Sequence, residues 1–450
     1  MKVKKRVKIS VWQLLALTYL AGTVLGSILL ILPCATKDGQ STSYLDALFT
    51  AASAVCITGL VPFDTATHWT LFGQLVILTL IQASGLGFMT LVSALFLIFK
   101  HGMGLGSRNA FLMDSRGNMK GLSTLLKRIV AGTFICEGLG ALLMMIRFIP
   151  DFGAANGIYF SVWHSVSAFC NAGFDLMGSH ENGLFVSLAA YARDPLISLT
   201  VTCLIYLGGL GFCVWGDVID CKFNVRKFQL NTKVVLLVNT VLLICGTALF
   251  VLFERNNPAY NDFNFGELVL ASLFNSMTPR TAGFSNADYT LFSESGYILT
   301  VLLMFIGGGS GSTAGGIRVG TFTVIIMGML AVFRGHRDIN IGKKRIDYSL
   351  LSQALAILAA CLMFIMISAT AICAFQPEVT FKAVLFECVS ALSNTGLSLS
   401  LTPDLAIPSK IIVIFLMYAG RVGILTLALA LGEKKSTAEI RKPIDSLLIG

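Results

Sequence analysis

The feature that most constrains this chain is a series of apolar stretches long enough to cross a lipid bilayer. About 20 mainly apolar residues, at 1.5 Å per residue, span the hydrocarbon core. Only 13% of the 450 residues are charged, against about 25% in soluble domains, so a soluble enzyme of several domains is excluded. We predict an all-α polytopic membrane protein. The predicted spans are Val11–Leu32, Leu71–Phe99, Ile129–Ile149, Leu196–Ile219, Val234–Phe253, Ile298–Phe333, Leu355–Phe375 and Ile411–Leu431.

Basic residues are distributed unevenly between the segments that join these spans. Of the 33 Lys and Arg residues, 24 lie in alternate segments, including both chain ends, and six lie in the intervening segments. The positive-inside rule then places both termini on the cytoplasmic side of the plasma (inner) membrane. Topology explains the basic surplus, so we predict no nucleic-acid partner. The long basic linkers Lys100–Arg128 and Arg334–Ser352 either lie along membrane lipid, dock a regulatory partner, or are solvated loops.

The sequence also contains a fourfold internal repeat. Four amphipathic segments, each too short to span, end in a polar strip and a glycine: Tyr44–Gly59, Ile158–Gly173, Glu267–Gly283 and Phe381–Gly396. The final glycines are separated by 114, 110 and 113 residues. A short helix of this kind between two spans is typical of a re-entrant segment.

Each repeat consists of a helix, a pore helix with its loop, and a second helix. Every repeat crosses the membrane twice, so all four share one orientation and are related by an axis along the membrane normal. Irregular backbone is tolerated at membrane depth only where it is buried or lines water, so the four loops should converge on a pseudo-fourfold pore axis. We predict repeats at residues 1–99, 100–219, 220–333 and 334–431, and a cytoplasmic tail at residues 432–450.

The loops have the chemistry of a cation filter. Rings of backbone carbonyls can replace the water shell of a monovalent cation, and glycine at positive φ lets successive carbonyls point the same way. Seen singly, each loop is more typical of a tight turn with a glycine cap, and it is the fourfold recurrence at matching positions that favours a filter. Arg280 is unusual in a cation filter, and we expect its side chain to point away from the axis. The predicted filter residues are Cys56, Ile57, Thr58, Gly59, Cys170, Asn171, Ala172, Gly173, Arg280, Thr281, Ala282, Gly283, Ser393, Asn394, Thr395 and Gly396.

A run of small residues interrupts the Ile298–Phe333 span and has low helix propensity. It should unwind at mid-membrane and act as a gate; helix-packing glycines and a nucleotide loop are the alternatives. Arg421 lies mid-span, where an arginine costs about 2.5–3.5 kcal/mol, so it should face the pore or an internal partner. The predicted gate residues are Gly307, Gly308, Gly309, Ser310, Gly311, Ser312, Thr313, Ala314, Gly315, Gly316 and Arg421.

Four acidic residues have two interpretations each. Glu137 lies within a span, where a buried ion pair or hydrogen bond is favoured over a role in permeation. Asp64, Asp175 and Asp288 follow filter glycines, and they either concentrate cations at the mouth of the pore or cap turns and helices.

The four Cys-Ile-Thr-Gly, Cys-Asn-Ala-Gly, Arg-Thr-Ala-Gly and Ser-Asn-Thr-Gly loops, together with Gly307–Gly316 and Gly420-Arg421, resemble the TrkH/KtrB/HKT superfamily of potassium transporters. Eight spans make the chain most similar to its KtrB-type, ion-translocating members. The resemblance implies K+ uptake by a channel-like protomer, a homodimer, and a cytosolic ring of nucleotide-binding RCK (KtrA-like) subunits. It also implies that Na+ is sometimes required and that Gly307–Gly316 and Arg421 close the pore.

The leading prediction is therefore a K+ pore with a carbonyl filter, with K+ at the filter and no organic cofactor on this chain. The alternative is a Na+-coupled secondary transporter with alternating access. A polytopic membrane enzyme is disfavoured, because the spans contain no cluster of His, Asp or Glu suited to catalysis.

Overall fold

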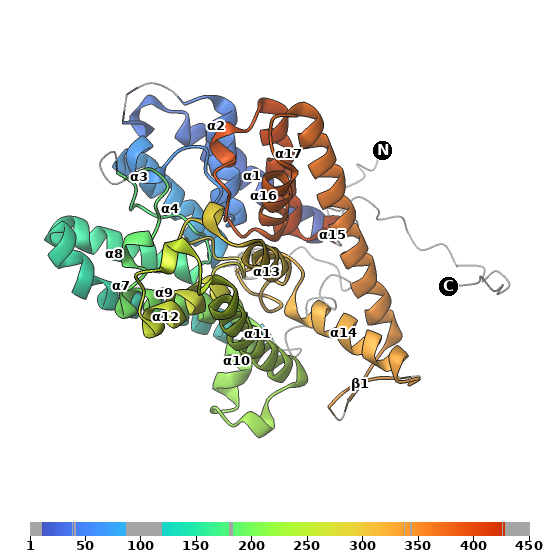
Figure 1. The fold of residues 1–450 in the computed structure, drawn as a ribbon. Helices are drawn as coiled ribbons and strands as arrows, with labels where there is room; N and C mark the ends of the chain where they lie inside the picture. The colour runs from blue at the N-terminus through green and yellow to red at the C-terminus, as the bar shows by residue number, and fades with distance from the viewer. Residues whose placement is uncertain are drawn as a thin grey trace, which may run out of the picture.

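The computed structural model describes residues 11–86 and 119–427, apart from residues 38, 40, 41, 180–182, 337, 343 and 425. In this part of the chain, four helices are long and apolar enough to cross a membrane, and a bent pair supplies a fifth candidate. Each long helix opens one of four units along the chain (Figure 1). The long helices are α1 (Val11–Leu30), α7 (Met119–Phe152), α11 (Leu230–Glu254) and α15 (Tyr348–Phe375).

A shorter helix of 13 to 16 residues follows each long one. These half-helices are mostly buried at their C-terminal ends, where the predicted filter loops begin. Two of these helices have capped N-termini: a Thr380 side chain caps the helix that begins at Phe381, and an Asn264–Glu267 capping box caps the one that begins at Phe265. The half-helices are α2 (Tyr44–Cys56), α8 (Ala154–Phe169), α12 (Phe265–Met277) and α16 (Phe381–Ser393).

The last part of each unit is a second helix. These are α4 (Leu71–Gly85), α9 (Pro195–Leu210) with α10 (Phe212–Asp220), α13 (Glu294–Phe305) with α14 (Val319–Phe333), and α17 (Ile407–Val422). The break in the third unit was expected, but the prediction of one continuous span at Leu196–Ile219 is wrong. The helix bends by 89° at Gly211, whose φ of +94° is a conformation that favours glycine.

Short elements connect the helices. They are α3 (Thr65–His68) and the 3-10 turns η1 (Pro33–Ala35), η2 (Ala189–Tyr191), η3 (Val225–Lys227), η4 (Pro258–Tyr260), η5 (Tyr289–Leu291) and η6 (Thr402–Asp404). The basic linker after α14 contains an antiparallel hairpin of β1 (Ile339–Ile341) and β2 (Lys344–Ile346). The predicted N-terminal segment, most of Lys100–Arg128 and the tail at residues 432–450 lie outside the described residues.

Apolar side chains cover the outside of this molecule as well as filling its core. Large apolar side chains on the outer faces of the long helices are about 60% exposed, among them Leu25, Ile146 and Ile367. Polar residues such as Glu387 and Asn394 are fully buried inside. Apolar surface this extended, with polar groups held inside, requires a hydrocarbon solvent, and the chain is an integral membrane protein.

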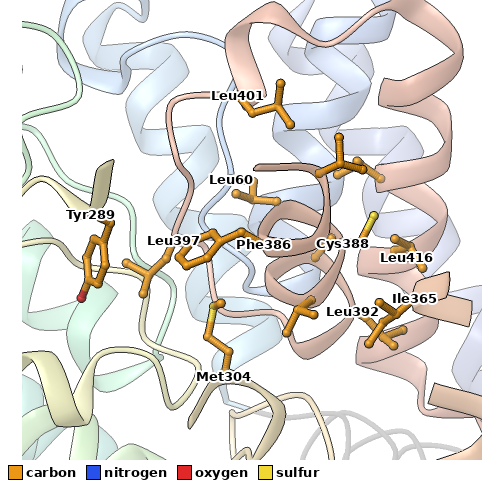
Figure 2. Close-up of a cluster of buried hydrophobic side chains, with 14 of the residues drawn as sticks. Leu60, Tyr289, Met304, Ile365, Phe386, Cys388, Leu392, Leu397, Leu401 and Leu416 are labelled. Atoms are coloured by element: carbon orange, nitrogen blue, oxygen red, sulfur yellow. The ribbon is translucent and has the colours of Figure 1, made fainter. Parts of the chain in front are cut away.

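The first and last units meet and close the arrangement. Helix α2 packs against α1 of its own unit and against α17 of the fourth (Figure 1). A buried cluster joins Leu60 of the first unit to Met304 of the third and to Leu392 and Leu416 of the fourth (Figure 2). This core therefore joins the first, third and fourth units near the loops that follow their half-helices.

Candidate functional site

The four predicted filter glycines lie against one another in a closed ring. A Cβ atom added to any of them would strike the carbonyl oxygen of the residue before the glycine of the next unit. The pairs are Gly59 with Ala172 at 2.6 Å, Gly173 with Ala282 at 2.7 Å, Gly283 with Thr395 at 2.5 Å, and Gly396 with Thr58. Because the fourth glycine meets the first unit, the contacts run once around an axis and return.

The backbone of each strip alternates in the way the carbonyl-filter hypothesis requires. Two residues before every glycine, a residue has positive φ, and the glycine itself has positive φ again. The values are Ile57 +56° and Gly59 +93°, Asn171 +58° and Gly173 +70°, Thr281 +68° and Gly283 +79°, and Asn394 +54° and Gly396 +92°. A β-branched residue such as Ile57 adopts this conformation only where its surroundings impose it. Packing therefore holds the strips in shape.

Side chains of the fourth strip tie it to its neighbours on both sides. Asn394 Nδ2 donates to Thr58 Oγ1 at 3.0 Å and to the carbonyl of Met417 at 2.8 Å. Thr395 Oγ1 donates to the carbonyl of Pro279 at 3.3 Å. The ring is thus fastened between units as well as within them.

A cavity of about 350 Å³ opens on one side of the ring. All four glycines line it, together with residues that follow each of them, including Asp64, Asp175 and Asp288. We call this space the mouth cavity. It has the position expected of a vestibule through which ions reach the ring.

The Gly307–Gly316 run forms a loop on the opposite side of the ring. Its ends are joined where Gly307 N–H donates to Ile317 O at 2.9 Å. Gly309 N–H donates to Gly209 O at 2.8 Å, beside the break in the second unit. A Cβ added to Gly315 would lie 2.8 Å from that of Asn394. The loop therefore lies between the second unit's broken helix and the glycine strip of the fourth unit.

Two arginines hold this loop through its carbonyl oxygens. Arg421 is buried, with 8% exposure, and donates to Thr313 O and, at 3.0 Å, to Ser84 O. Arg318 donates to Ala314 O and, at 3.3 Å, to Gly309 O. In the described residues neither arginine has a carboxylate within ion-pair distance. An internal salt bridge, the alternative to a pore-facing Arg421, is therefore not found there, and the hydrogen-bond partners of Arg421 are backbone oxygens.

The sequence matches one family of known proteins along nearly its whole length. The sequence profile described as "TrkH: Cation transport protein" matches residues 12–438. The chain belongs to the TrkH family. The potassium/sodium uptake protein NtpJ of Enterococcus hirae is 38% identical, over 100% of this chain and 99% of that one. The Ktr system potassium uptake protein B of Bacillus subtilis is 36% identical, over 100% and 99%.

Solved structures agree with this assignment at the level of fold. The crystal structure of the potassium transporter TrkH from Vibrio parahaemolyticus superposes with a TM-score of 0.71 at 16% identity, covering 96% of this chain and 87% of that one. TrkH family members are cation transport proteins and not enzymes. The predicted architecture of four units around a pseudo-fourfold axis is confirmed.

Behind the ring of this TrkH family protein lies a set of hydroxyl groups that the sequence analysis did not predict. Ser53 Oγ accepts from Gly59 N–H at 3.0 Å, and Ser390 Oγ accepts from Gly396 N–H at 3.1 Å. In the second unit Ser167 Oγ donates to Phe174 O at 2.7 Å, and Thr278 bonds to Phe284 O in the third. The available signal was a Ser or Thr five or six residues before every glycine. We call these four residues the hydroxyl clamps.

Arg280 and Glu137 both lie behind the strips. The Arg280 guanidinium donates to Asn239 O at 3.3 Å and to Gly307 O at 3.4 Å, so it points away from the ring and links the third strip to the loop. Glu137 accepts from Gln82 Nε2 at 3.1 Å. That contact is the buried hydrogen bond we expected for Glu137.

The three aspartates at the mouth both cap local structure and line the cavity. Asp64 accepts from Thr67 N–H at 3.0 Å, Asp288 from Thr290 N–H at 2.8 Å, and Asp175 from Met177 N–H at 3.1 Å. Burial raises the pKa of Asp175 to about 6, and the charge of Asp64 adds to the rise, against the Met177 hydrogen bond. Within the described ranges, no three His, Cys, Asp or Glu side chains are grouped to hold a resident metal ion.

Proposed function

We propose that this TrkH family protein takes up K+ across the plasma membrane through a channel-like pore. The filter is formed by Cys56–Gly59, Cys170–Gly173, Arg280–Gly283 and Ser393–Gly396, and both termini are cytoplasmic. The observation that carries the proposal is the closed ring of glycine strips with alternating backbone. The names of the two relatives, both potassium uptake proteins, support the choice of ion.

Selection by backbone oxygens follows from the chemistry of the strips. A cation that leaves water must regain oxygen ligands, and carbonyls supply them without a fixed charge that would hold the ion too tightly. The C-terminal ends of the four half-helices point their carbonyls toward the ring, which favours cations over anions. Inward flux is driven by the membrane potential, at about 2.3 kcal/mol per charge per 100 mV.

The Gly307–Gly316 loop and Arg421 are proposed as the gate. The loop lies on the far side of the ring from the mouth cavity, where a closed segment blocks ions that have passed the filter. The loop is hydrogen-bonded to the broken helix of the second unit. A shift of that helix would therefore move the loop. Docking of a cytosolic RCK ring on a homodimer would then act on this loop through the helices.

Reconstitution of the full chain in proteoliposomes tests the proposal. With a negative potential imposed inside, the protein should carry K+ and Rb+ and exclude Na+ and anions, and addition of an RCK ring should change the rate. Absence of potential-driven K+ flux from correctly folded protein would contradict the function itself. Flux that an RCK ring does not alter would contradict only the regulatory part.

The second candidate is Na+-coupled K+ transport with alternating access. It is favoured by one relative that is named a potassium/sodium uptake protein. K+ uptake that stops without Na+ and shows a fixed Na+:K+ stoichiometry would select this candidate over the pore.

A further inference from the structure

A buried carboxylate lies directly behind the wall of the mouth cavity. Glu387 is on α16, its side chain is fully buried, and it is absent from the filter and the gate. Its Oε2 accepts from Ser398 Oγ at 2.8 Å, and its Oε1 accepts from the Thr402 hydroxyl. Both hydroxyl residues line the mouth cavity. Glu387 therefore lies one side chain away from entering ions.

The hydrogen bonds fix which part of each hydroxyl faces the ion. A hydroxyl has one hydrogen to donate and two lone pairs to accept with. Ser398 and Thr402 give their hydrogens to Glu387, and Ser398 accepts one further bond from Leu401 N–H at 3.2 Å. Ser398 therefore keeps one lone pair and Thr402 keeps two, and neither hydroxyl has a hydrogen left for the cavity. An oxygen presented in this way attracts a cation, whereas a free hydroxyl can turn its hydrogen outward.

The charge of Glu387 has no basic partner nearby. In the described part of the chain, Lys382 on the same helix pairs with Glu294, and no Lys, Arg or His lies within ion-pair distance of Glu387. Buried acidic groups usually have such a partner or a metal ion. A cation in the mouth cavity would supply a compensating charge through the two hydroxyls.

We propose that Glu387 is a positioning residue for ion uptake, which orients the hydroxyls of Ser398 and Thr402 so that their oxygens receive the entering cation. This rests on the proposed function, because it concerns how K+ enters the same pore. It predicts an effect on the affinity for the ion and little effect on the maximal rate, since the filter and gate are untouched.

Glu387→Gln tests the proposal in the full-length protein in proteoliposomes. The amide keeps the shape, removes the charge and gives a donor to one hydroxyl, which must then turn its hydrogen toward the cavity. The KM for K+ should rise about tenfold, on the scale of one charge-assisted hydrogen bond, with the maximal rate within about twofold. Ser398→Ala removes one of the two oxygens and should raise KM in the same direction by about threefold.

The chain offers a matched control. Glu254 is equally buried, at 1% exposure, and accepts from Ser293 Oγ at 2.6 Å, but Ser293, unlike Ser398 and Thr402, does not line the mouth cavity. Glu254→Gln should leave KM unchanged. The proposal is overturned if Glu387→Gln leaves KM unchanged, or if Glu254→Gln raises it equally. Should Glu387→Gln fail to reach the membrane, Ser398→Ala decides: an unchanged KM overturns the proposal. Wild-type protein without K+ uptake would instead contradict the proposed function.

Discussion

The ring and the loop below it are built from the same kinds of small residues, but they are held in different ways. Every strip of the ring packs on the next unit and has its own hydroxyl clamp, so four similar sets of contacts support it. The Gly307–Gly316 loop occurs in one unit only and is held by hydrogen bonds from Arg421, Arg318 and neighbouring backbone. The ring is therefore supported by contacts that recur in all four units, whereas the loop depends on hydrogen bonds that are made once.

The largest expected effect comes from adding a side chain to the ring. Gly283→Ser places a Cβ 2.5 Å from Thr395 O at a φ of +79°, so the strip must shift. We expect K+/Na+ discrimination to fall by about tenfold or more, because the carbonyls no longer match the ion. Competitive Rb+ and Na+ flux in proteoliposomes measures it.

Gly153→Ser is the matched control for that variant. Gly153 has the same φ of +79°, but no atom lies within 4 Å of its added Cβ. Backbone strain alone should leave discrimination unchanged. If both variants lost K+/Na+ discrimination equally, the loss in Gly283→Ser could not be due to the clash with Thr395 O.

Removing Arg421 should affect rate more than selection. Arg421→Ala loses the hydrogen bonds to Thr313 O and Ser84 O, each charge-assisted. Flux without an RCK ring should rise by about fivefold, while K+/Na+ discrimination stays the same. Reduced discrimination with unchanged flux would mean that this residue belongs to the ring and not to the loop.

A smaller effect is expected from a hydroxyl clamp. Ser167→Ala removes one of the two side-chain hydrogen bonds to Phe174 O and leaves the one from Trp163 Nε1 at 3.2 Å. It should lower discrimination by about threefold, consistent with one lost buried hydrogen bond. Ser161 on the same helix donates to Gly157 O of its own helix at 2.7 Å, so Ser161→Ala is the control and should have no effect on discrimination. Thermal unfolding of both variants separates stability from selection.

The smallest effect concerns pH at the mouth. Asp175 has a pKa raised to about 6, so it is ionised at pH 7.5 and becomes neutral as the pH of the mouth-side solution falls below about 6. Loss of this charge should raise the KM for K+ by about twofold. Asp175→Asn should show the higher KM both at pH 7.5 and below about pH 6, with no change in KM between the two conditions. A pH dependence that survives in Asp175→Asn would assign the titration to another group.

Repetition explains what could be predicted from the sequence. The four glycines stood out because they recur at nearly equal intervals, and positive φ at such positions follows from glycine itself. The kink at Gly211 was missed, because apolar residues flank it and the hydropathy of Leu196–Ile219 is uninterrupted. Its cause is tertiary: Gly211 lies against Ser310 O of the loop, where a Cβ would be 2.6 Å away.

Partners of polar side chains were the least predictable part. The position of Arg421 at mid-span could be predicted to need compensation, but its acceptors, Thr313 and Ser84, are distant in sequence and are backbone atoms. Glu387 carried no signal of its own. Its significance depends on where the fold places Ser398 and Thr402 relative to the cavity.

All four strips of the ring belong to one polypeptide. In an assembly of four identical subunits, any replacement appears four times and preserves the symmetry of the aperture. Here an amino-acid replacement appears in one strip only. The ring can therefore become asymmetric, with each of its four quadrants changed independently. Arg280 illustrates this freedom: one quadrant carries a cationic side chain that is turned outward, and the other three quadrants have no counterpart at that position.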